Sequence, residues 1–260
     1  MCRMMGIVSP HGLDADLVAR FRQQARGHVA AGESPGHADG WGIVYYDERA
    51  HPEYAGRSPH DAATDPAFEE AVAELHKRRP AGPLLAHVRK ASAGGVSLEN
   101  THPFLHGRWS FCHNGTVFGL AEETARPAGR VGTWGLAPEG ESDSRALFGR
   151  LMDDIMRGDE PMEAIAALAR HVEPLRHTSL TFLLTDGATL WGLRKVGNVD
   201  EECRDDACSP DYYTLGFARI GEHTVVSQEQ EFLDVQQWRV VPDSHVVIVH
   251  RDGRAQIEAL

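Results

Sequence analysis

The chain has 260 residues, of which 42% are hydrophobic and 25% are charged, and its formal net charge is −12. This composition is typical of a globular protein with a large core, and its acidic balance argues against nucleic acid or an anionic membrane surface as the main partner. No stretch approaches the roughly 20 consecutive apolar residues of a membrane span, and Ser9-Pro10 interrupts the first apolar run too early for a secretory signal. We therefore expect a cytoplasmic protein.

The first half of the chain is predicted to alternate strands and helices. Apolar residues at 4–9 indicate a short buried strand, and Asp14 is placed to cap an amphipathic helix that ends near Gly32. Residues 47–65 are polar and rich in turn formers, and Pro66 suits the first turn of a second helix. The other strands expected in this half lie at 41–46, 83–90 and 109–113.

The second half begins with a long loop at 120–141, which has no periodicity and is of a length typical of functional or disordered segments. One helix is expected to begin at Asp143-Ser144, and another to cover about 161–175. An acidic segment at 198–211 is predicted to be an exposed loop. The expected strands lie at 180–184, 189–195, 213–219, 224–227, 240–241 and 245–250. A single α+β domain over residues 2–260 is the simplest account of this pattern.

Cys2 is the first candidate catalytic residue. Removal of Met1 would leave a thiol and a free α-amine on one residue. The two groups titrate at about pH 8.5 and about pH 8, so the amine can accept the thiol proton without another side chain. Position 2 alone does not separate this reading from a cysteine that follows Met1 by chance.

Two polar segments at strand ends suit an acyl-transfer site. His87 and Arg89 share one face of a strand, and a buried guanidinium there would bind a carboxylate, either of a substrate or of a structural ion pair. Asn114 and Gly115 offer an amide and a main-chain N–H at adjacent positions, which suits an oxyanion hole or a plain Asn-Gly turn.

Two further segments carry the remaining polar candidates. Asp143 could hold a substrate ammonium group or cap the helix that begins there. His102 could serve the site or hydrogen-bond its own loop. No H-E-x-x-H or paired C-x-x-C motif occurs, so a metallohydrolase is disfavoured and we expect neither a metal nor a cofactor.

The motifs together resemble one family. They are M-C-R at the amino terminus, then A-D-G-W-G, A-H-V-R, S-L-E-N-T-H-P-F, H-N-G and E-S-D-S, in this order. This series is similar to the class II glutamine amidotransferases, which are N-terminal-nucleophile hydrolases, and in particular to the bacterial branch that consists of the glutaminase domain alone. The resemblance covers almost the entire chain. It implies a four-layer α/β/β/α sandwich and hydrolysis of an amide with release of ammonia.

The resemblance also implies roles for the residues that match. Cys2 would be the nucleophile, with its α-amine as the base, and Asn114 and Gly115 would form the oxyanion hole. Asp39, in the A-D-G-W-G turn, would have a mainly structural role beside the nucleophile.

Four more positions would bind the substrate. Arg89 would bind the α-carboxylate with Ser92 as a helper, Asp143 would bind the α-ammonium group, and His102 would lie near the site.

The destination of the ammonia stays open. It could pass to a separate synthase subunit or be released by simple hydrolysis of glutamine. The substrate could also be another γ-glutamyl amide, as in the related branch that acts in ergothioneine synthesis. A module that binds the ligand without turnover is the alternative outside the enzymes.

Overall fold

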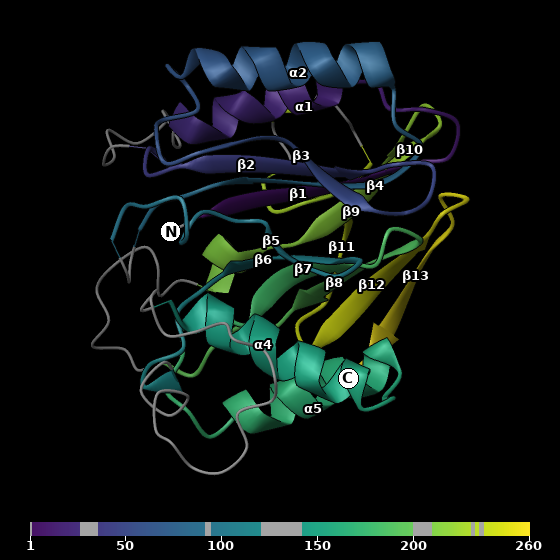
Figure 1. Ribbon diagram of the computed structural model, residues 1–260. Helices are drawn as coiled ribbons and strands as arrows, with labels where there is room; N and C mark the ends of the chain where they lie inside the picture. The colour runs from purple at the N-terminus through teal and green to yellow at the C-terminus, as the bar shows by residue number, and fades with distance from the viewer. Residues whose placement is uncertain are drawn as a thin grey trace.

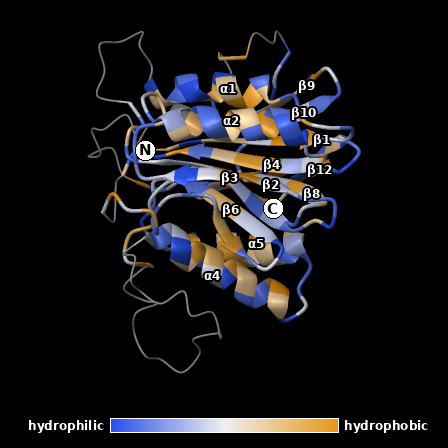
Figure 2. Ribbon diagram, turned by 45° about the horizontal axis from the view of Figure 1, so that its top comes forward, coloured by the Kyte–Doolittle hydropathy of each residue, from blue (hydrophilic) through white to orange (hydrophobic). Residues whose placement is uncertain are grey.

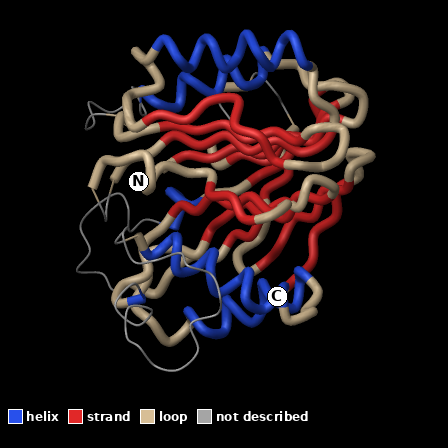
Figure 3. The backbone as a smooth tube through the Cα atoms, in the orientation of Figure 1, coloured by secondary structure: helices blue, strands red, loops and turns tan. Residues whose placement is uncertain are grey.

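The computed structural model describes residues 2–26, 36–91, 95–120, 142–199, 210–229, 232–233 and 237–260. Two antiparallel β-sheets stack face to face, and helices cover the outer face of each sheet (Figures 1 and 3). The layers therefore follow the order helix, sheet, sheet, helix. This confirms the predicted α/β/β/α sandwich, whereas the assignment of residues 2–260 to one domain stays a prediction.

The first sheet has seven strands in the order β11-β9-β10-β1-β4-β2-β3. Their bounds are β1 Arg3–Ser9, β2 Trp41–Tyr46, β3 Pro52–Ser58, β4 Gly82–Val88, β9 Gly216–Ile220, β10 His223–Ser227 and β11 Arg239–Val240. Every residue of β1 is buried, as expected for a central strand that is covered on both faces. Cys2, which directly precedes β1, is thereby held at the end of a fixed strand.

The second sheet has six strands in the order β13-β12-β8-β7-β6-β5. Their bounds are β5 Phe104–His106, β6 Trp109–Asn114, β7 Thr181–Thr185, β8 Thr189–Arg194, β12 His245–His250 and β13 Ala255–Ala259. The layer between the sheets is filled by apolar side chains from both, among them Met4, Leu85, Cys112, Leu183 and Val247. This packing fixes the distance between β1 and β6, whose ends carry Cys2 and Asn114.

Helices α1 (Asp16–Phe21) and α2 (Pro66–Arg78) cover the first sheet, and α4 (Asp143–Met156) and α5 (Pro161–Val172) cover the second. Figure 2 shows hydrophobic residues on the sheets and on the helix faces that meet them. Pro66 lies in the first turn of α2 as predicted, and the Asp65 side chain caps this helix by accepting from Ala67 N at 3.0 Å. None of the helices within the described ranges is long and apolar enough to cross a membrane.

Three sequence predictions need correction. Residues 47–65 were expected to form turns, but β3 lies among them, and its half-buried position at the sheet edge gives it no apolar pattern. The strand expected at 213–219 begins only at Gly216, after a 3-10 helix at Pro210–Tyr213. Tyr213 and Leu215 are apolar and buried like strand residues, so the sequence pattern placed the start of the strand too early. The first α-helix ends at Phe21 and continues as a 3-10 helix to Arg26. Several predictions concern segments outside the described residues. They are the end of the first helix beyond Arg26, residues 121–141 of the long loop, and residues 200–209 of the acidic segment.

Candidate active site

Cys2 and Asn114 meet where strands of the two sheets end. The nitrogen of Cys2 donates a hydrogen bond to Asn114 Oδ1 at 3.1 Å, and the Cys2 thiol lies 3.7 Å from the carbonyl oxygen of Lys90. Asn114 is the last residue of β6 and is buried. After removal of Met1 this nitrogen would be the α-amine, so the structure joins the candidate nucleophile and one candidate oxyanion donor directly.

The surroundings of Cys2 shift the pKa of its thiol in two opposite directions. Desolvation raises the pKa of this thiol, whereas the hydrogen bond to Lys90 and the charges of Arg89 and Arg3 lower it. The thiol therefore holds its proton in the resting site, and the surrounding positive charge favours the thiolate once a base accepts that proton.

Gly115 is required by the close approach of another main chain. Its φ is +153°, and a Cβ at this position would overlap the carbonyl oxygen of Ser179. The same carbonyl accepts from His113 Nε2 at 3.2 Å. The step from Asn114 to Gly115 is therefore held against the main chain at Ser179.

The end of β4 is tied to the A-D-G-W-G turn by three hydrogen bonds. Arg89 N donates to Gly40 O at 2.7 Å, Asp39 N donates to Arg89 O at 2.9 Å, and Ala91 N donates to Asp39 Oδ2 at 2.8 Å. These bonds fix the Lys90 carbonyl that contacts the Cys2 thiol. They agree with the mainly structural role expected for Asp39.

Arg89 lies at this strand end and is buried, with Nη1 donating to Gly95 O at 3.1 Å. Its charge acts on the Cys2 thiol, so the candidate carboxylate anchor shares the site with the candidate nucleophile. Ser92, the expected helper, lies outside the described residues.

Asp143 is buried at the first position of α4. Its Oδ2 accepts from Val117 N at 2.6 Å, and its Oδ1 accepts from the Ser144 hydroxyl at 3.4 Å. Ser144 Oγ is also 2.9 Å from His113 Nδ1. These contacts connect the carboxylate to the loop that follows Gly115, so Asp143 lies beside the Asn114-Gly115 turn as well as at a helix start.

His102 is buried in a small aromatic cluster. Its ring centroid lies 4.5 Å from that of His87 and 4.2 Å from that of Phe104. Desolvation lowers the pKa of both histidines well below the usual value, so both rings are neutral. The contacts of the His102 ring are with His87 and Phe104. A substrate-binding role for His102 stays a prediction.

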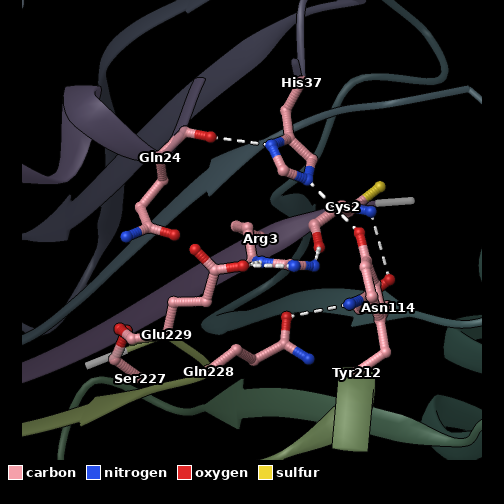
Figure 4. A network of polar contacts seen from close by, with 9 residues as sticks. All are labelled: Cys2, Arg3, Gln24, His37, Asn114, Tyr212, Ser227, Gln228 and Glu229. Atoms are coloured by element: carbon pink, nitrogen blue, oxygen red, sulfur yellow. Dashed lines mark hydrogen bonds and ion pairs between the residues drawn. The ribbon is translucent and has the colours of Figure 1, made fainter. Parts of the chain in front are cut away.

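The structure also places five residues around Cys2 to which the sequence analysis gave no role. Arg3, Gln228 and Glu229 form contacts with Cys2 or its immediate partners. The Tyr212 ring packs against the Arg3 guanidinium, and the Tyr212 hydroxyl lies 3.4 Å from His37 Nε2 (Figure 4). Burial and the nearby Arg3 charge lower the pKa of His37 to about 3. No local pattern could identify Glu229, which meets Arg3 from 226 positions away.

Comparison with known families decides the relationship. A model described as "Glutamine amidotransferases class-II" matches residues 1–206. The chain belongs to this family. The family resemblance inferred from the ordered motifs is thereby confirmed.

Curated relatives support the same assignment. An Escherichia coli protein named "Putative glutamine amidotransferase YafJ" is 32% identical over 155 residues, which are 57% of this chain and 52% of that protein. A Haemophilus influenzae protein of the same designation is 29% identical over 198 residues, or 72% of this chain and 60% of that protein. The matched part of this chain thus spans little more than half the length of these relatives.

Solved structures share the fold at low sequence identity. Glutamine phosphoribosylpyrophosphate amidotransferase from B. subtilis aligns with 99% of this chain and 49% of its own, at a TM-score of 0.66 and 17% identity. A glutamine aminotransferase class-II domain protein from Silicibacter pomeroyi aligns with 100% of this chain and 99% of its own, at a TM-score of 0.63 and 17% identity.

Proposed function

We propose that the protein hydrolyses the γ-amide of glutamine through a thioester on Cys2. The observation that carries this proposal is the 3.1 Å hydrogen bond between the Cys2 nitrogen and Asn114 Oδ1. It joins a thiol, a prospective α-amine and an amide donor at one point. Membership of the class II glutamine amidotransferase family supports the choice of glutamine.

The first half of the proposed reaction forms the thioester. The α-amine of Cys2 accepts the thiol proton, and Sγ attacks the γ-carbonyl carbon of the substrate. Negative charge then develops on the carbonyl oxygen. One N–H of Asn114 Nδ2 donates to Gln228, and the other N–H and the N–H of Gly115 stabilise this charge. The carbon–nitrogen bond breaks as the α-ammonium group of Cys2 donates its proton to the leaving nitrogen, and ammonia leaves.

The second half restores the enzyme. Water attacks the thioester, the α-amine accepts a proton from it, and the sulfur–carbon bond breaks to give glutamate and free Cys2. The substrate is held by its α-substituents throughout. Arg89 binds the α-carboxylate as a fork of donors, and Asp143 pairs with the α-ammonium group.

The fate of the ammonia and the exact amide are parts of the same proposal. We take simple release of ammonia as the reaction of the isolated chain, and transfer to a separate synthase subunit as its extension. Other γ-glutamyl amides are the alternative substrates. A cytoplasmic location remains a prediction.

The test is turnover by protein whose amino terminus has been verified as Cys2 by intact mass. Glutamate and ammonia release is measured with L-glutamine and with a panel of γ-glutamyl amides. We expect Cys2→Ala to abolish release, and a thioester adduct on Cys2 to be detectable by mass spectrometry after rapid acid quench.

Cys112→Ala is the matched control. Cys112 is fully buried between the sheets, so the Cys112→Ala variant should be less stable than the wild type. Desolvation raises the pKa of the Cys112 thiol, which keeps it protonated, so the variant should retain its activity. Activity in Cys2→Ala, or in protein that retains Met1, would refute the proposal. Stabilisation by glutamine without any turnover would favour the binding module instead.

A further inference from the structure

A second set of contacts lies behind Cys2 and holds its main chain. Arg3 Nη1 donates to the Cys2 carbonyl oxygen at 3.0 Å, and the same guanidinium forms an ion pair with Glu229. Arg3 Cζ also lies 3.9 Å from the centroid of the Tyr212 ring. Because the Arg3 side chain is only 6% exposed, its charge is tolerated only with such partners. Glu229 and Tyr212 therefore fix the Arg3 guanidinium, which donates to the Cys2 carbonyl oxygen.

A separate contact fixes the amide of Asn114. Asn114 Nδ2 donates to Gln228 Oε1 at 3.0 Å, while Asn114 Oδ1 accepts from the Cys2 nitrogen. The Cys2 nitrogen donates to the oxygen of the Asn114 amide, and as an ammonium group it can only donate. Nδ2 must then face Gln228, which must present its own oxygen. Gln228 thus selects one of the two orientations of Asn114.

Both contacts come from two consecutive residues that follow β10. Gln228 N donates to Met4 O at 3.4 Å, which ties the pair to the beginning of β1, and Ser227 Oγ donates to Glu229 O at 2.9 Å. The side chains of Gln228 and Glu229 extend to different partners, Asn114 for the first and Arg3 for the second (Figure 4).

We propose that Gln228 and Glu229 are positioning residues for the Cys2 site. Gln228 orients the Asn114 amide so that one N–H of Nδ2 remains available for the oxyanion. Glu229 acts through Arg3 to fix the carbonyl, and with it the rotation, of Cys2. This inference rests on the proposed function, but it concerns residues that contact neither the substrate nor the reacting atoms.

Two substitutions of similar shape separate positioning from stability at Gln228. Gln228→Met removes the acceptor, and kcat for glutamine should fall by about 10–100-fold with little change in KM, because Arg89 and Asp143 still bind the substrate. Gln228→Glu keeps an acceptor, and the donor it loses, Nε2, has no partner within the described ranges. It should recover most of the lost kcat. Equal losses in both variants that follow their melting temperatures would overturn the role of Gln228.

A double-mutant cycle tests Glu229. Glu229→Gln leaves the buried Arg3 charge unbalanced, and we expect kcat to fall by about 10-fold. In an Arg3→Met background, which leaves only the partly exposed Glu229 carboxylate, the same change should cost less than about 2-fold. Additive effects would overturn action through Arg3. Glu258→Gln, an exposed change on β13, is the control that should leave kcat unchanged.

One measurement is independent of turnover. The side-chain amide of Asn114, assigned in NMR spectra by its loss in Asn114→Asp, should show hydrogen exchange that is slow in the wild type and in Gln228→Glu and fast in Gln228→Met. Wild-type protein with this pattern but no ammonia release would refute the proposed function alone. Active protein without this pattern would refute the positioning role alone.

Discussion

Asn114 Oδ1 accepts a hydrogen bond from the nitrogen of Cys2, 112 positions earlier in the chain, at 3.1 Å. Asn114→Asp keeps an oxygen at this position but removes the two N–H donors of Nδ2. We expect kcat/KM for glutamine to fall by roughly 10²–10³-fold, the usual cost of one oxyanion donor. Steady-state kinetics on protein with a verified Cys2 terminus measures this loss.

The control for this substitution is the reactivity of Cys2 itself. Alkylation of the thiol by iodoacetamide needs no oxyanion donor, so Asn114→Asp should remain alkylated at a rate within several-fold of the wild type. A variant that cannot be alkylated has lost the nucleophile's geometry, and its kinetics would not support an oxyanion role.

Asp143→Asn separates substrate binding from helix capping. The asparagine oxygen can still accept from Val117 N, so α4 should keep its start, but the negative charge is lost. We expect KM for glutamine to rise by about 10–100-fold, as for a lost charged hydrogen bond, with a melting temperature close to that of the wild type. The matched control is Asp16→Asn, which makes the same change at the first position of α1, where the side chain is 70% exposed. A KM that is equal in both variants would exclude Asp143 as the ammonium anchor.

Gly115→Ala tests the close approach between Gly115 and the carbonyl oxygen of Ser179. The new Cβ would overlap Ser179 O, and the left-handed φ adds strain, so the free energy of unfolding should fall by roughly 2–5 kcal/mol and activity should be lost. Gly95→Ala meets no atom within 4 Å and serves as control. Urea denaturation of both variants measures the difference. Comparable stability of the two would mean that the main chain at Gly115 can move away from Ser179.

The buried His102 predicts a loss of stability in acid. Its pKa is depressed in the fold, so below about pH 6.5 the unfolded chain binds a proton that the native protein does not. Stability is therefore retained above the unfolded pKa and lost as the pH falls below it. In His102→Phe, the slope of the unfolding free energy against pH between 5 and 6.5 should decrease by up to about 1.4 kcal/mol per pH unit. Urea titrations of the wild type and of the variant at several pH values measure this slope.

Much of the fold could be predicted because its central strands have strong local patterns. The run from Met4 to Val8 and the strand at Trp41–Tyr46 are apolar throughout, and Asp65-Pro66 is a clear helix start. The edge strand β3 has no such pattern, since one side of it is not covered. Edge position is a property of the sheet and is not encoded in the local sequence.

The candidate site could be predicted where a residue type carries its own chemistry. Cys2, Asn114 and Arg89 were candidates for what a thiol, an amide or a guanidinium can do at a strand end, but the family resemblance was needed to select them, and their roles stay predictions. Gln228 and Glu229 were missed because their contacts depend on the pairing of β10 with β1, which places Ser227 opposite Met5. Such cross-strand neighbours cannot be identified from a single sequence without homologues.

The central position of β1 has a consequence for biosynthesis. Cys2 is synthesised before the strands that come to surround it: β1 gains its second neighbour only when β10 has been made, and Arg3 gains its ion pair only with Glu229. Until then a nascent chain has the Cys2 thiol without the complete surroundings of the candidate site. The order of synthesis thus delays assembly of this site until β10 and Glu229 have been made.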